Sequence, residues 1–119
     1  MKKTVVFVAS PNALRFSHKM VKSLIRYDHD VVPVGFREGS ICDIPIQTNF
    51  PVVKNVDTVS LYLNPVKQSE FYDYIISLEP KRVIFNPGTY NPEFVNLLRK
   101  NNIEAVIDCA LVMLSKGIY

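Results

Sequence analysis

The sequence has no tryptophan, two cysteines and four glycines, and no glycine precedes Gly35. The G-x-G-x-x-G fingerprint of dinucleotide-binding folds is therefore absent from the first part of the chain. Cys42 and Cys109 lie far apart and match no metal-ligand spacing, so neither a disulfide framework nor a metal site is predicted. This use of cysteine favours a reducing, cytoplasmic setting.

Long apolar runs and a strong excess of one charge are also missing. No apolar stretch reaches the roughly 20 residues that a membrane-spanning helix needs, and the run after the first lysines is too short for a signal peptide. Fourteen Lys and Arg residues stand against eleven Asp and Glu residues, which gives a net charge of +3. Because the basic residues are scattered, we expect a small anionic ligand and no nucleic-acid or membrane partner.

The chain of 119 residues is 48% hydrophobic and 21% charged, which predicts one globular domain over residues 1–119. Five apolar segments have the composition of strands, and helical patterns lie between most of them. The expected strands are residues 5–9, 31–34, 57–63, 82–85 and 103–107. One expected helix carries Met20, Leu24 and Ile25 on one face, and two more lie near residues 66–78 and 91–101. Residues 35–56 are expected to be rich in loops.

Strands that alternate with helices predict βαβ units and a parallel sheet covered on both faces. We therefore expect a three-layer, doubly wound α/β fold with a five-stranded parallel sheet in the order 3-2-1-4-5. Pro33 suits the second strand to an early or edge position. In such folds the ligand crevice opens at the carboxyl ends of the strands, at the topological switch point.

The turn after the first strand carries the richest set of polar groups, in Ser10-Pro11-Asn12 and onward to Ser17. A strand that leads through a short turn into a helix brings free N–H groups and the positive end of a helix dipole together, which suits a phosphate. Arg15 can hold a phosphate with two hydrogen bonds, and the Ser and Asn side chains can add neutral ones. The alternative is that Ser10 or Asn12 caps the helix and Arg15 is solvated.

Two further turns are candidates. The segment with Phe36, Arg37 and Glu38 follows the second strand, where doubly wound folds contact the nucleoside part of a ligand. Arg37 suits a ribose phosphate. Glu38 leaves the alternative that an acidic side chain binds the ribose hydroxyls of a ligand. Gly88, after the fourth strand, offers a bare backbone to a ligand. The alternative for both segments is a surface turn.

The sequence contains no evident catalytic set. Cys109 follows the last strand, but the two histidines, His18 and His29, are expected to be exposed in or just after the first helix. A thiol without a base is a poor nucleophile, so we expect Cys109 to be structural. The aspartates form no pair at a strand end, which argues against two-carboxylate chemistry.

Several motifs in one order resemble the small stand-alone CoA-binding domain proteins, which are related to the N-terminal domain of the succinyl-CoA synthetase α subunit. The resemblance covers nearly the whole chain. It is carried by residues 5–12, 15–17, 33–35, 57–65, 85–89 and 109–114. The chain has no counterpart of the ligase domains of the synthetase, so we do not expect a complete CoA ligase.

The resemblance implies a Rossmann-like fold that lays the CoA nucleotide across the carboxyl ends of the strands. It implies that the phosphates bind the Ser10-Pro11-Asn12 turn and the Arg15-Phe16-Ser17 segment. Arg37 matches the basic residue after the second strand, and Phe36 lies beside it. The loops that line the crevice match Leu63, Asn64 and Gly88.

The chain departs from the family pattern at Val8, where the family usually has glycine, and at Phe16, where tyrosine is common. A valine at this position either packs into the layer covering the sheet or projects toward the ligand. We predict a non-catalytic module that binds CoA or an acyl-CoA. The alternatives are an NAD(P)-binding oxidoreductase, or a fragment of one, and a protein-interaction module that has lost the ligand.

Overall fold

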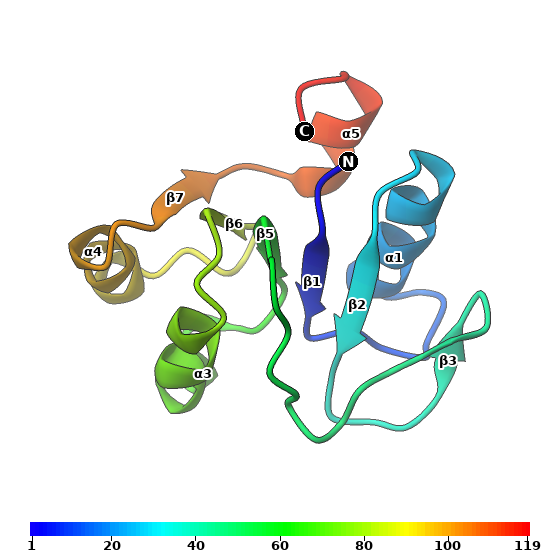
Figure 1. Ribbon diagram of the computed structural model, residues 1–119, viewed down its shortest axis with the longest axis horizontal. Helices are drawn as coiled ribbons and strands as arrows, with labels where there is room; N and C mark the ends of the chain where they lie inside the picture. Colours follow the sequence, from blue (N-terminus) through cyan, green and yellow to red (C-terminus); the bar gives the residue numbers. More distant parts are fainter.

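The computed structural model describes residues 1–119 and centres on a five-stranded parallel sheet (Figure 1). Its strands run in the order β2-β1-β5-β6-β7, with bounds β1 (Thr4–Phe7), β2 (Val31–Val34), β5 (Thr58–Leu61), β6 (Arg82–Phe85) and β7 (Glu104–Ile107). A short antiparallel hairpin, β3 (Ser40–Ile41) and β4 (Ile44–Pro45), lies within the segment expected to be loop-rich. The predicted class, a doubly wound α/β fold with a five-stranded parallel sheet, is confirmed.

The helices follow the predicted segments with two differences, because the segment near residues 66–78 is broken and a helix over residues 110–115 was not predicted. Their bounds are α1 (Phe16–Arg26), α2 (Pro65–Gln68), α3 (Tyr72–Ser77), α4 (Pro92–Lys100) and α5 (Ala110–Ser115), and a 3₁₀ turn spans Ser69–Phe71. The single helix expected near residues 66–78 is therefore broken into three short pieces. Asn64 caps α2 by accepting the N–H of Val66 at 2.9 Å, and Asn91 caps α4 through Phe94 at 3.3 Å. Each cap is followed by a proline, which suits the first helical position.

The predicted strand order was wrong. The third predicted strand, β5, pairs with β1 and β6 and does not lie outside β2, so the order in those terms is 2-1-3-4-5. Pro33 of β2 stands opposite Val6, and its carbonyl points outward to accept the N–H of Gln47 at 2.9 Å. The outer edge of β2 thus lacks a donor at Pro33, and a further strand there would lose a ladder hydrogen bond.

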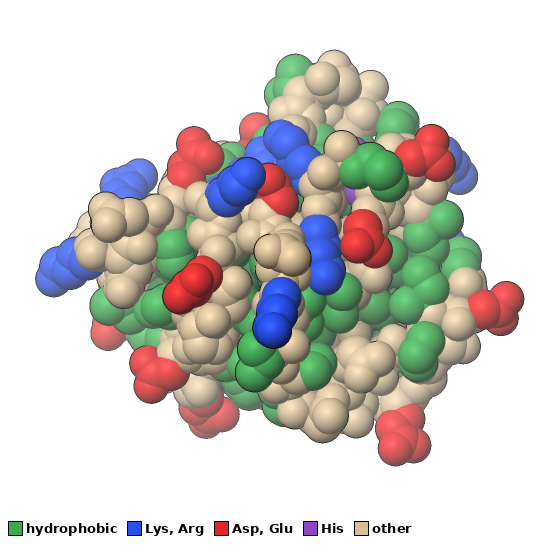
Figure 2. Space-filling view, viewed as in Figure 1, with side chains coloured by type: hydrophobic (Ala, Val, Ile, Leu, Met, Phe, Trp, Pro, Cys, Tyr) green, Lys and Arg blue, Asp and Glu red, His purple; other side chains and the backbone are tan.

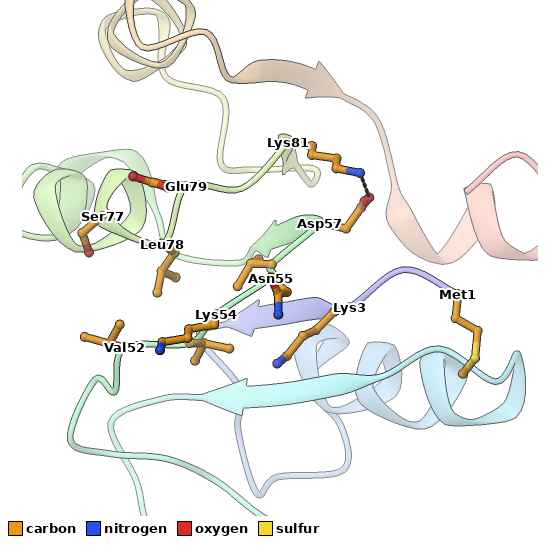
Figure 3. Close-up of a pocket in the computed structure, with 12 residues that line it drawn as sticks. Met1, Lys3, Val52, Lys54, Asn55, Asp57, Ser77, Leu78, Glu79 and Lys81 are labelled. Atoms are coloured by element: carbon orange, nitrogen blue, oxygen red, sulfur yellow. Dashed lines mark ion pairs between the residues drawn. The ribbon is translucent and has the colours of Figure 1, made fainter.

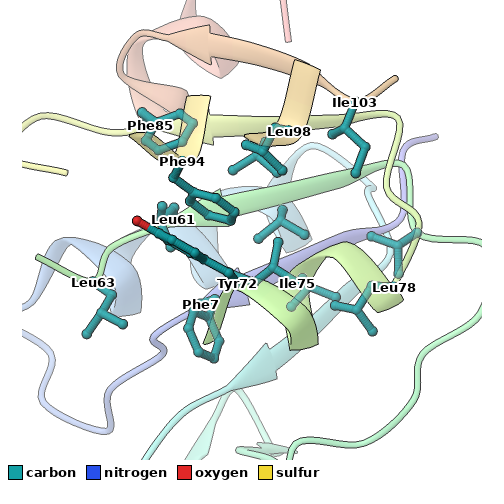
Figure 4. Close-up of a cluster of buried hydrophobic side chains, with 14 of the residues drawn as sticks. Phe7, Leu61, Leu63, Tyr72, Ile75, Leu78, Phe85, Phe94, Leu98 and Ile103 are labelled. Carbon is teal, nitrogen blue, oxygen red and sulfur yellow. The ribbon is translucent and has the colours of Figure 1, made fainter. Parts of the chain in front are cut away.

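Alternating side chains of the strands point into two apolar layers, one on each face of the sheet. Toward α3 and α4, Phe7 and Leu61 pack with Tyr72 and Phe94 (Figure 4), whose rings stack with centroids 4.3 Å apart. The opposite layer packs the sheet against α1 and α5 (Figure 1). Every residue of β1, β5 and β6 is buried, which confirms the prediction that both faces are covered.

The amino-terminal and carboxyl-terminal residues of the structure lie side by side (Figure 1). The hydroxyls of Thr4 and Tyr119 are 2.6 Å apart, and the guanidinium of the buried Arg82 lies 4.6 Å from the centroid of the Tyr119 ring. Arg82 also donates from Nε to the Thr58 hydroxyl at 2.8 Å. Stacking on the ring and this hydrogen bond offset the desolvation of a cation that has no carboxylate partner.

His29 contacts this cluster and gives it a pH dependence. Its Nδ1 accepts the backbone N–H of Lys2 at 2.9 Å, and burial, with the positive charges of the amino terminus, Lys2 and Arg82, lowers the pKa of His29. In the unfolded chain the imidazole titrates near 6.5. As the pH falls below that value, the unfolded chain takes up a proton that the folded protein resists, so the free energy of unfolding decreases.

We therefore expect a His29→Gln variant to lose less stability than the wild type between pH 7.5 and pH 5.5. Urea unfolding of both proteins at the two pH values measures this difference, and the carboxylates common to both cancel in the comparison. Equal pH dependence in the two proteins would show that His29 is not a source of the effect.

Candidate functional site

A crevice of about 660 Å³ opens at the carboxyl ends of β1, β2, β5 and β6. Every residue that the sequence predicted to bind a ligand lines this crevice, namely Ser10, Pro11, Asn12, Arg15, Ser17, Phe36, Arg37, Leu63, Asn64 and Gly88. These residues come from four separate loops. The crevice lies at the carboxyl end of β1, and successive connections leave β1 in opposite directions, which is where doubly wound sheets bind ligands.

The turn between β1 and α1 uses its polar side chains internally. The Ser10 hydroxyl accepts the N–H of Asn12 at 3.1 Å, and the Asn12 side-chain oxygen accepts the N–H of Leu14 at 3.0 Å. The N-cap of α1 is Arg15, whose side chain makes no capping hydrogen bond. The alternative in which Ser10 or Asn12 caps the helix is therefore wrong.

The first turn of α1 keeps its N–H groups free. The amides of Phe16, Ser17 and His18 donate no hydrogen bond, whereas the amide of Lys19 donates to the Arg15 carbonyl at 3.2 Å. Free N–H groups at the start of a helix carry the positive end of its dipole. Because Arg15, Phe16 and Ser17 line the crevice, this end of α1 can receive an anion.

His18 is buried, and the prediction that it is exposed was wrong. Its ring Nδ1 lies 2.8 Å from the Ser10 carbonyl oxygen, and only 6% of the residue is exposed. Because a carbonyl only accepts hydrogen bonds, Nδ1 carries the proton in this contact. His18 lies three residues before Val21 on the buried face of α1, a helical spacing that could have indicated its burial. This hydrogen bond attaches the turn between β1 and α1 to the first residues of α1.

The charged side chains that line the crevice are all basic. Arg15, Arg37 and Lys67 are exposed and come from three different loops or helix starts, and no Asp or Glu lines the crevice. Sequence analysis missed Lys67, although it follows the Asn64 cap by one helical turn. Three cations without a nearby acid raise the local positive potential and attract a ligand with several negative charges.

Gly35 and Gly88 allow the backbone to come close to the crevice. A Cβ on Gly35 would lie 2.2 Å from the Ala9 carbonyl oxygen, so only glycine lets the loop after β2 approach the turn after β1. This approach carries Phe36 and Arg37 to the crevice. Gly88 has a φ of +88° and open space where a Cβ would stand, so it leaves bare backbone beside a ligand.

Phe36 presents half of its ring to solvent at the rim of the crevice. Its inner side rests on an aromatic cluster, with ring centroids 5.5 Å from Phe71 and 5.9 Å from Phe50. The cluster also includes Phe7 and Tyr74. A half-exposed ring held in place by neighbouring rings gives a planar ligand an apolar surface to pack on.

Val8 is half-buried and combines the two roles considered for it. It packs against the apolar layer that contains Phe7 and Leu61, and it also lines the crevice. Tyr62 lies in the crevice wall as well, and burial raises the pKa of its phenol, which therefore stays protonated at neutral pH. The inner wall is thus uncharged.

The buried Asn86, directly after β6, is joined by its side chain to the end of β5 and to the start of α5. Its side-chain nitrogen donates to the Ser60 hydroxyl at 2.9 Å and to the Leu61 carbonyl at 3.0 Å, and its oxygen accepts the N–H of Ala110 at 2.9 Å. All of these contacts are buried, so losing the amide would leave several polar groups unpaired. Asn86 therefore holds the loop after β6 in place.

A second cavity, of about 720 Å³, opens at the opposite end of the sheet. Figure 3 shows that its lining mixes both signs of charge, with Lys3, Lys54, Asp57 and Glu79 around it, and Asp57 pairs with Lys81 at 3.9 Å. Figure 2 shows acidic and basic side chains interspersed on the same face of the molecule. Ligands of doubly wound sheets bind at the carboxyl ends of the strands, so this cavity is the weaker candidate.

No group of His, Cys, Asp and Glu side chains is arranged to hold a metal ion. None of the helices has both the length and the apolar character needed to cross a bilayer.

The crevice and its sheet match a known family. The family model described as "CoA binding domain" matches residues 2–115. The chain belongs to this CoA-binding domain family. The resemblance found in the sequence is thus confirmed. No curated protein matches the chain.

Solved structures share the fold of this CoA-binding domain. A crystal structure described as that of an uncharacterized protein is 46% identical, with a TM-score of 0.98 over 100% of this chain and 98% of that chain. A Thermus thermophilus structure, cell-free ID.343, is 21% identical with a TM-score of 0.86, over 99% of this chain and 90% of that chain. A hypothetical protein from Pyrococcus horikoshii OT3 is also 21% identical, with a TM-score of 0.83 over 98% and 82% of the two chains.

The crevice of this CoA-binding domain is lined by the hydroxyls of Ser10, Ser17 and Thr89 and by the amine of Lys67. His, Cys, Asp and Glu are absent from its lining. Cys109 is half-buried at the N-cap of α5 and lies outside the crevice, as does Glu38. The arrangement suits the binding of an anion and an apolar group.

Proposed function

We propose that this CoA-binding domain binds CoA or an acyl-CoA without catalysing a reaction. One observation carries the proposal. The unpaired N–H groups of Phe16 and Ser17, at the start of α1, lie at the same crevice as Arg15, Arg37 and Lys67. CoA carries a diphosphate and a separate ribose phosphate, and a cationic crevice at a helix amino terminus has the matching chemistry.

Each part of the crevice has a role in this proposal. The turn from Ser10 to Ser17, with Pro11 and Asn12, receives the diphosphate beside Arg15. Arg37 pairs with the ribose phosphate, and Phe36 with Leu63 supplies the apolar surface for the adenine. Asn64 and Gly88 border the path of the remaining chain of the ligand. Lys67 adds a third cation for the phosphates.

The charge of the crevice favours CoA over NAD. A nicotinamide dinucleotide is usually held by an acidic residue on its ribose hydroxyls and by a glycine-rich turn at its phosphates. The crevice has no acidic residue, and the turn after β1 has no glycine. Glu38, which could have supplied the acid, does not line the crevice.

We expect CoA to bind with a micromolar Kd and NAD to bind much more weakly. A micromolar Kd corresponds to about −8 kcal/mol, which a few phosphate contacts and one buried adenine can supply after the costs of association. Calorimetric titration of the purified protein with each compound tests this. Tighter binding of NAD than of CoA would overturn the proposal.

A further inference from the structure

Gln68 is a fully buried polar side chain that reaches from α2 to two loops of the crevice. Its exposed fraction is 0%. Its side-chain nitrogen donates to the carbonyls of Leu63 and Thr89, each at 2.8 Å. Leu63 and Thr89 themselves line the crevice, and they belong to the loops after β5 and β6. One amide group therefore joins two walls of the site.

The orientation of this amide is determined by its partners. Two carbonyl oxygens can only accept hydrogen bonds, so the NH₂ group of Gln68 must face them. The remaining oxygen accepts the side-chain N–H of Asn91 at 3.0 Å. Asn91 in turn donates to the Tyr72 hydroxyl at 2.8 Å and caps α4. The contacts of Gln68 thus form one connected and buried network.

Neither loop has regular secondary structure to hold it at these carbonyls. If the loops separated, the buried carbonyls of Leu63 and Thr89 would lose their donor, which is costly away from water. The same contacts anchor α2 from its buried side, while the neighbouring Lys67 is exposed to the crevice. The position of Lys67 therefore depends on the hydrogen bonds of Gln68, the next residue in the chain.

We propose that Gln68 is a positioning residue that locks the loops after β5 and β6 into one arrangement and so sets the width of the ligand crevice. It touches no ligand itself. This inference rests on the proposed binding of CoA for its effect on affinity. The coupling of the two loops is a property of the protein alone and can be measured without any ligand.

The test compares Gln68→Glu and Gln68→Met with the wild type by hydrogen–deuterium exchange without ligand. Glutamate keeps the shape but sets an oxygen against two carbonyls, and methionine keeps the volume without a donor. We expect the amides of residues 63–67 and 87–91 to exchange about tenfold faster in both variants, which corresponds to the loss of about one net hydrogen bond. Exchange in β1 should not change, and CoA affinity should fall about tenfold.

Two control variants separate positioning from general destabilisation. Gln47→Glu makes the same chemical change at the only other glutamine, whose side chain has no hydrogen bond, and should leave exchange and affinity unchanged. Ile103→Ala removes a buried side chain at the amino end of β7. It should lower thermal stability without a selective effect on the two loops or on CoA affinity.

The outcomes distinguish the two proposals. Faster exchange spread evenly over the chain, as expected for Ile103→Ala, would show that Gln68 is merely structural and would overturn the inference. Faster exchange in only one of the two loops would also overturn it, because the loops would not be coupled. If the wild type binds no CoA while both loops respond to Gln68, the proposed function fails and the coupling stands. The methionine variant decides the question if the glutamate variant does not fold.

Discussion

Replacing Arg15 and Arg37 together by glutamine is expected to weaken CoA binding by about 100-fold or more. Hydrogen bonds to charged groups contribute about 1.5–3 kcal/mol each, and both side chains line the crevice beside the free N–H groups of α1. Both arginines are exposed, so solvent screens their interaction with the phosphates. The expected loss of binding free energy is therefore near the lower end of the sum of the two contributions. Calorimetric titration of the variant with CoA measures it.

The matched control is Arg26→Gln with Arg99→Gln. These arginines are also exposed, lie at the carboxyl ends of α1 and α4, and do not line the crevice. The control makes the same change in net charge, so it separates local contacts from long-range attraction. Raising the salt concentration should weaken CoA binding to the wild type more than to the crevice variant. Equal affinity of the two double variants would contradict the placement of the phosphates.

Val8→Gly is expected to lower the free energy of unfolding by about 2 kcal/mol. Full burial of a valine contributes roughly 1.5–3 kcal/mol, of which the half-buried Val8 provides a part. Glycine adds a cost of about 0.5–1 kcal/mol through the greater freedom of the unfolded chain. Urea unfolding measures the change, with the exposed Val66→Gly as a control for the backbone term.

The same variant should strengthen CoA binding, because Val8 also occupies part of the crevice wall. Removing its side chain lets a phosphate come closer to the backbone at the position where the family usually has glycine. Weaker or unchanged affinity would show that Val8 acts only in packing. A wild type that binds no CoA and gains binding with the glycine would favour the protein-interaction module that has lost its ligand.

Local patterns were sufficient to predict the strands and most of the helices. The apolar run at residues 5–9 overlaps β1, and the helical patterns near residues 66–78 and 91–101 correspond to α2 with α3 and to α4. These signals depend on neighbours in the chain, because burial of a strand and capping of a helix involve residues a few positions apart. Secondary structure and fold class could therefore be predicted from the sequence.

The strand order could not be predicted in the same way. It depends on which edge of β1 the strand β5 reaches after the long connection through residues 35–56. Pro33 contained a signal for this order, because a proline removes one donor from the outer edge of a strand and is found mainly on edge strands. Pro33 indicated an early or edge strand, whereas the predicted order placed that strand inside the sheet.

The sequence by itself determined the alternation of strands and helices, and with it the expectation that polar turns meet at one edge of a parallel sheet. Only the tertiary structure decided that Arg15, Arg37 and Lys67 share one crevice, and that His18 and Gln68 hold its loops from beneath. The physical reason is the nature of a buried hydrogen bond. Whether a polar side chain is satisfied depends on the groups opposite it in space. For Gln68, one such group lies 21 residues away along the chain.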